Sequence, residues 1–92
     1  MNQNIKRIAK HYGFQHQVTK TTEECGEFIA ALSKLANDEG SRKDVLEEMA
    51  DVMVMMQQMQ YFLCINPSEL HKTMEAKVHR QIERIGNECE NT

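Results

Sequence analysis

Two short segments of the chain each place three carboxylates beside apolar residues. The first, EECGEFIAAL, covers residues 23–32, and the second, EEMADVMVMM, begins 24 residues later and covers residues 47–56. Each segment contains two acids that are three residues apart: Glu24 and Glu27 in the first, Glu48 and Asp51 in the second. On a helix, side chains with this spacing lie on one face, so each pair can reach a single ion.

The two acid pairs also share a helical phase. When Cys25 is placed at the middle of one apolar face and Met49 at the middle of the other, both pairs fall on the same flank, and Lys20 joins that flank. Antiparallel helices packed by these faces would bring four carboxylates together, where they repel one another unless a proton or a cation compensates them. An all-oxygen site favours Mg²⁺ or Mn²⁺. One such pair alone is common on a solvated helix face, so the second, matched pair carries the metal hypothesis.

The elements that must position these acids are all predicted to be helices. Capping signals and apolar periodicity predict four of them, at about residues 3–12, 14–36, 42–63 and 67–85. Gly13 ends the first, Ser41 and Asn66-Pro67 begin the last two, and Gly86 is the expected stop, with residues 87–92 fraying. The short turn between the middle helices predicts an antiparallel hairpin. We therefore expect one all-α domain over residues 1–92.

Composition narrows the class of protein. The formal net charge is −3 and the isoelectric point near 5.8, which disfavours a binder of nucleic-acid polymers. The chain has three cysteines, an odd number, and no CxxC motif, and no leader segment is recognised. We therefore expect the cysteines to be reduced thiols in a cytoplasmic protein. No apolar run reaches the roughly 18 residues of a membrane span. The segment VMVMM, residues 52–56, is apolar on more than one face and predicts a seam between identical subunits.

The last predicted helix carries a basic stripe. Lys77, Arg80 and Arg84 follow an i, i+3, i+7 spacing and share a face. Considered alone, these residues indicate a solvated basic stripe paired with Glu75 and Glu83. If they lay opposite a metal held by the acids, they could bind the phosphates of a polyphosphate. A di-iron carboxylate site is disfavoured because no Glu is followed by His three residues later, and the histidines and cysteines show no zinc spacing.

The segments KTTEECGEF, residues 20–28, and EEMADVM, residues 47–53, resemble the MazG-like all-α nucleoside triphosphate pyrophosphohydrolases, whose signature is EExxE, a spacer and ExxD. The 20 residues between Glu27 and Glu48 suit that spacing, and the resemblance covers about residues 14–85. It implies a four-helix fold that assembles as a dimer or tetramer. It also implies Mg²⁺-dependent cleavage of a nucleoside triphosphate between the α and β phosphates, which yields the monophosphate and pyrophosphate.

Carried over residue by residue, the resemblance assigns roles to nine side chains. The metal ligands would be Glu24, Glu27, Glu48 and Asp51, the base or water-positioning residue Glu23, and the phosphate-binding residues Lys20, Lys77, Arg80 and Arg84.

Other functions stay open at this point. Within the superfamily a phosphoribosyl-ATP pyrophosphohydrolase is less favoured because this chain has no Trp, and dUTPase-like members are usually longer. A non-catalytic helical interaction module is the alternative outside enzymes. The sequence does not fix the base or sugar of a nucleotide. Candidate walls for a base are Tyr12, Phe14, His16, Phe28, Tyr61 and Phe62, although packing or an interface is the favoured interpretation of each.

Overall fold

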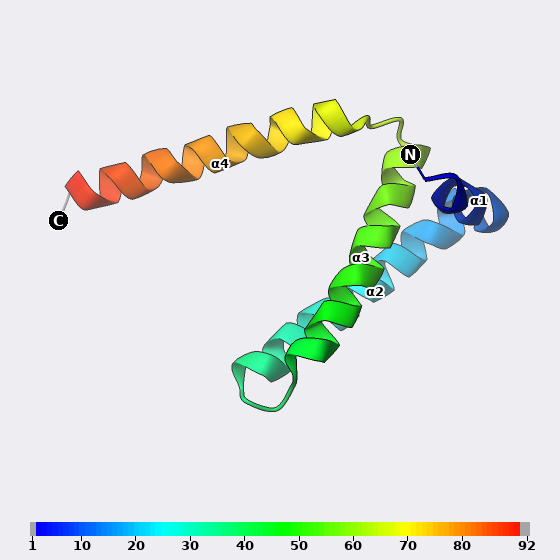
Figure 1. Ribbon diagram of the computed structural model, residues 1–92, viewed down its shortest axis with the longest axis horizontal. Coiled ribbons are helices and arrows are strands. Elements are labelled where there is room, and N and C mark those ends of the chain that lie inside the picture. Colours follow the sequence, from blue (N-terminus) through cyan, green and yellow to red (C-terminus); the bar gives the residue numbers. More distant parts are fainter. Residues whose placement is uncertain (1, 91–92) are drawn as a thin grey trace.

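The computed structural model describes residues 2–90 and consists of four α-helices joined by short turns (Figure 1). The helices are α1 (Gln3–Tyr12), α2 (Phe14–Ala36), α3 (Arg42–Phe62) and α4 (Pro67–Glu90). No strand occurs within residues 2–90. The all-α prediction is confirmed, and the first three helices begin and end within one residue of their predicted bounds.

Local capping explains why the helices begin where they do. The Ser41 hydroxyl accepts a hydrogen bond from the Asp44 N–H at 3.1 Å, and the Asn66 side-chain oxygen accepts one from the Glu69 N–H at 2.8 Å. Each bond satisfies a backbone donor that has no partner inside its own helix. Gly13 separates α1 from α2 with φ at +85°, a conformation that favours glycine.

Helices α2 and α3 form the predicted antiparallel hairpin (Figure 1). The turn over residues 37–41 reverses the chain, and Asp38 takes a positive φ of 60° within it. α1 packs on both hairpin helices. The small apolar core shared by the three helices consists of Ile5, Ala9, Ala31, Val52 and Met55.

The faces by which α2 and α3 meet differ from the predicted ones. Cys25 is only half-buried and Met49 is 42% exposed, so neither lies at the middle of the packed face. The packed faces instead centre on Glu24 and Met55. The prediction failed because it ranked faces by hydrophobicity alone, whereas α2 buries Gln17 and Glu24 where the polar side chains of Gln58 and Glu48 on α3 face them. Glu24 and Glu48 therefore lie within the seam, whereas Glu27 and Asp51 are exposed at its edge.

The apolar faces that the prediction placed in the seam remain largely exposed. At 100° per residue on antiparallel helices, they lie on the same side of the hairpin, opposite the side that carries Glu23, Glu27 and Asp51. We call this the apolar side; its exposed residues are Val18, Ile29, Leu32, Leu46, Met49, Met53 and Met56.

Helix α4 packs against none of the other three helices and projects away from them (Figure 1). The expected four-helix bundle is therefore not formed within one chain; three helices pack and the fourth stands apart. α4 also continues through Gly86 to Glu90, beyond the predicted end at Ile85, since a helical Gly costs only about 1 kcal/mol relative to Ala. Residues 91–92 of the expected frayed tail lie outside the described residues. Among residues 2–90, no helix is both long enough and apolar enough to cross a bilayer.

Candidate metal centre and adjoining cavity

Three of the four predicted metal ligands come together at the seam of the hairpin. Glu24, Glu27 and Glu48 each offer a carboxylate oxygen, and these oxygens all lie within 4.8 Å of one another. α2 supplies the first two from successive turns, and α3 supplies the third from across the seam. We call these three residues the acid cluster. Asp51, the fourth predicted ligand, is exposed and outside this group, although its charge acts on Glu48.

Two oxygens of the acid cluster are buried without a hydrogen-bond donor. Glu24 is only 7% exposed, and Oε2 of Glu24 and Oε2 of Glu48 are shielded from solvent and accept no hydrogen bond within residues 2–90. A buried polar atom without a partner costs free energy. A divalent cation is the partner whose chemistry suits several carboxylate oxygens at once.

The electrostatics of the cluster are those of crowded negative charges. The pKa of the Glu48 carboxyl is raised, chiefly because the group is withdrawn from solvent, and further by the charges of Glu27 and Asp51. Hydrogen bonding to Glu27 and the charge of Glu24 act in the same direction. The cluster therefore favours taking up positive charge, as a proton or as a cation.

Lys20 lies on the flank where the sequence placed it and compensates part of this charge. Its Nζ is 3.2 Å from Oε1 of Glu24 and 3.8 Å from Oε2 of Glu23. The hydrogen bond to Glu24, followed by the charge of that carboxylate, raises the pKa of Lys20. Lys20 thus engages one oxygen of Glu24 and leaves the other to the acid cluster. Glu23 points outward, and its side chain is 58% exposed.

The basic residues of α4 lie apart from the acid cluster. Lys77, Arg80 and Arg84 are exposed on a helix that packs against no other element of the described chain. The expected pairing of this stripe with Glu75 and Glu83 also differs, because those carboxylates pair with histidines instead. The pairs are His71 with Glu75 at 2.7 Å and His79 with Glu83 at 3.0 Å.

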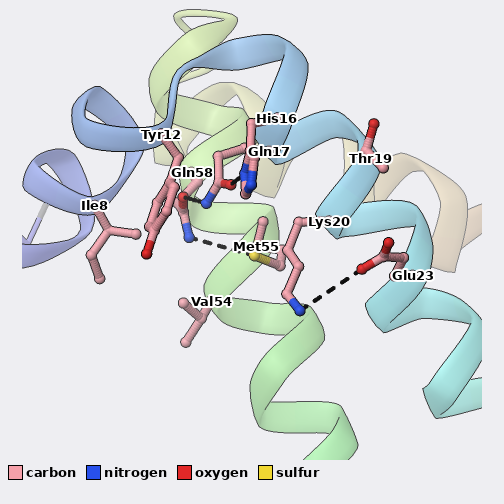
Figure 2. Close-up of a pocket in the computed structure, with 10 residues that line it drawn as sticks. All are labelled: Ile8, Tyr12, His16, Gln17, Thr19, Lys20, Glu23, Val54, Met55 and Gln58. Carbon is pink, nitrogen blue, oxygen red and sulfur yellow. Dashed lines mark hydrogen bonds and ion pairs between the residues drawn. The ribbon is translucent and has the colours of Figure 1, made fainter.

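A cavity of about 650 Å³ adjoins the acid cluster between α1, α2 and α3 (Figure 2). Its lining includes Ile8, Tyr12, Gln17, Lys20, Val54 and Gln58. The sequence pointed to Tyr12 as a candidate wall for a base but not to the two glutamines. Spacing could have revealed them only if the packed faces had been placed correctly, since Gln17 lies seven residues before Glu24 and Gln58 three after Met55.

Hydrogen bonds fix the polar part of this cavity. Gln17 Nε2 donates to Gln58 Oε1 at 2.8 Å, and His16 Nδ1 lies 2.6 Å from Gln17 Oε1. Because an amide oxygen only accepts, Nδ1 of His16 carries the proton in this arrangement. The His16 ring also stacks on Tyr12, with centroids 4.8 Å apart and planes 17° from parallel.

No protein-family model matches the chain, and it matches no curated protein and no solved structure. The resemblance to the MazG-like enzymes therefore rests on the two acid motifs and their spacing.

Proposed function

We propose that this protein is a divalent-cation-dependent nucleoside triphosphate pyrophosphohydrolase, which releases a nucleoside monophosphate and pyrophosphate. One observation carries the proposal: three carboxylates from two helices converge within 4.8 Å, and two of their buried oxygens lack a donor. An acid cluster of this kind is costly unless a cation occupies it. The resemblance of the two acid motifs to the MazG-like signature supports the choice of reaction.

Glu24, Glu27 and Glu48 would hold the cation, with Asp51 reaching it from the next turn of α3. These ligands are all hard oxygen donors, which suits Mg²⁺ and, as a substitute, Mn²⁺. When bound, such an ion neutralises phosphate charge and lowers the pKa of coordinated water.

The remaining roles fall to side chains beside the acid cluster. Glu23 is exposed next to it and paired with Lys20 through one oxygen, so its other oxygen can orient a water molecule or accept its proton. Lys20 holds an ammonium group between Glu23 and Glu24, where it can donate to phosphate oxygens. Lys77, Arg80 and Arg84 would reach the site of another copy, or of their own chain after α4 moves.

We also propose that the active form is a homodimer or homotetramer. The apolar side of the hairpin leaves Ile29 65%, Met53 56% and Met56 53% exposed. An exposed apolar surface of this extent marks an interface.

The same exposed surface supports a second function, a non-catalytic helical interaction module. In that case self-association or partner binding would survive neutralisation of the acid cluster, and no triphosphate would be hydrolysed.

Pyrophosphate release from a panel of canonical and modified nucleoside triphosphates tests the enzymatic proposal. With Mg²⁺ present we expect turnover of at least one substrate by the wild-type protein. Glu23→Gln should lower kcat by about 10²–10⁴-fold, the usual contribution of a general base. Glu48→Gln should abolish turnover, whereas Glu47→Gln, at the exposed neighbouring acid, should retain it. Folded, Mg²⁺-replete protein that turns over no triphosphate contradicts the proposal.

A further inference from the structure

The cavity between α1, α2 and α3 has the features of a site for a flat, partly polar ligand. Its volume of about 650 Å³ lies within the range of small-molecule sites. Lys20 and Glu23, which border the acid cluster, also line this cavity. Figure 2 shows Ile8 and Tyr12 toward one side of the cavity and Glu23 toward the other. A ligand whose charged end lay at the acid cluster could therefore extend its uncharged end toward α1.

Part of the cavity lining is apolar and exposed to solvent. Ile8, Tyr12 and Val54 are 39%, 52% and 41% exposed, respectively, although all three line the cavity. The Tyr12 ring is already ordered by its stacking on His16. A planar aromatic ligand placed against Tyr12 would gain stacking and bury apolar surface at little cost in side-chain entropy.

The lining of the cavity also presents a buried amide with donor capacity to spare. Gln58 is 1% exposed, and its oxygen already accepts a hydrogen bond from Gln17. Its Nε2 carries two hydrogens, yet its partner is the thioether of Met55 at 3.5 Å, a weak acceptor. A ring nitrogen or carbonyl oxygen would satisfy this group better. The ligand that combines a flat ring, such acceptors and a polyphosphate is a nucleotide.

We propose that this cavity binds the nucleobase of the triphosphate substrate, with the base packed against Tyr12 and hydrogen-bonded by Gln58. Gln17 and His16 act as positioning residues, because the bond from Gln17 holds the Gln58 oxygen and leaves the Gln58 nitrogen for the base. This inference rests on the proposed function, since it assigns the base of the nucleotide whose phosphates lie at the acid cluster.

Calorimetric titration in Mg²⁺ tests the stacking contact. The probes are α,β-methylene nucleoside triphosphates, which resist cleavage between the α and β phosphates, and inorganic tripolyphosphate, which has no base. Tyr12→Ala should weaken nucleotide binding by about 5- to 100-fold, the usual range for one base stacked on a ring, and should leave tripolyphosphate binding unchanged. Tyr12→Phe keeps the ring and should bind nucleotide as the wild type does. Tyr12 is half-exposed, so circular dichroism should show both variants folded.

Side-chain amide resonances test the hydrogen bond without any substitution. Adding free nucleosides to the ¹⁵N-labelled protein should shift the Gln58 and Gln17 amide signals. The exposed amide of the neighbouring Gln57 is the internal control and should stay in place.

The outcomes separate this inference from the proposed function. If nucleotides bind no more tightly than tripolyphosphate, or if Tyr12→Ala weakens both equally, the cavity does not hold the base, although the phosphate site stands. If neither nucleosides nor nucleotides bind, the inference is also overturned. If nucleotides bind as described but none of the natural triphosphates is hydrolysed, the base site is supported and the enzymatic proposal fails.

Discussion

Gln17, Glu24 and Gln58 are the buried polar side chains of the described chain, and all three lie on the faces by which α2 and α3 meet. Such a seam forgoes part of the free energy that apolar contacts would supply. The two amides offset this by pairing with each other, but Glu24 is only half compensated, through Lys20. The residual cost is therefore concentrated at the acid cluster, where a cation would remove it.

Neutralising Glu48 should show this cost directly. Without metal, Glu48→Gln should raise the melting temperature, because the amide removes one of three crowded charges. Mg²⁺ at ten times its dissociation constant should raise the melting temperature of the wild type by on the order of 5–10 °C and that of the variant little. The matched control is Glu47→Gln, since Glu47 is exposed and outside the acid cluster. An equal response of all three proteins to Mg²⁺ in thermal scans would rule out a shared cation site.

The raised pKa of Glu48 also predicts a pH dependence with a definite sign. The folded protein holds this proton more tightly than the unfolded chain, so the proton stabilises the fold. That stabilisation is complete below the ordinary pKa of 4.5 and is lost as pH rises through the raised value. In metal-free buffer, the melting temperature of the wild type relative to Glu48→Gln should therefore decline as pH rises from about 4.5 toward neutrality. A difference that is flat with pH, or that grows, would contradict the assignment.

At the scale of the helices, two glycines should respond oppositely to the same substitution. Gly13 joins α1 to α2 with φ at +85° and open space where a Cβ would lie, so Gly13→Ala introduces backbone strain rather than a clash. We expect it to cost about 1–3 kcal/mol in urea denaturation. Gly26 lies within α2, also with open space, so Gly26→Ala should stabilise by about 0.5–1 kcal/mol through helix propensity. If Gly13→Ala leaves the unfolding midpoint unchanged or raises it, the joint at Gly13 is not strained as described.

Sequence patterns captured the elements better than their packing. Caps and periodicity are local, so Ser41 and Asn66 marked their helices correctly. Which helix face meets which depends on partners elsewhere in the chain. Gln17 and Gln58 are 41 residues apart, and nothing in either local segment reveals that their amides pair. The acid cluster could be predicted because both motifs repeat the same spacing. The adjoining cavity could not be predicted, because it depends on how α1 packs on the hairpin.

At the scale of the whole molecule, the fold is too open for a self-sufficient chain. The radius of gyration is 16.9 Å, against about 12 Å for a compact domain of this length. Within residues 2–90 only five apolar side chains are buried, while 18 large hydrophobic ones are exposed. α4 contributes to this with its own apolar stripe of Leu70, Met74, Val78, Ile82 and Ile85. An isolated helix is marginal in water, so helical content should rise with protein concentration as copies cover these surfaces.

A charge placed on the apolar side should therefore disrupt self-association. Met53 is 56% exposed on α3, and a Lys there would be buried without a partner in any interface that uses the apolar side. We expect Met53→Lys to weaken self-association by more than about tenfold in sedimentation equilibrium. Glu47→Lys is the control, since Glu47 is exposed on α3 about 120° around the helix from Met53, away from the apolar side, and Lys favours helix about as well as Glu. A wild type that stays monomeric at all concentrations, or a control as disruptive as Met53→Lys, would show that copies do not associate through the apolar side.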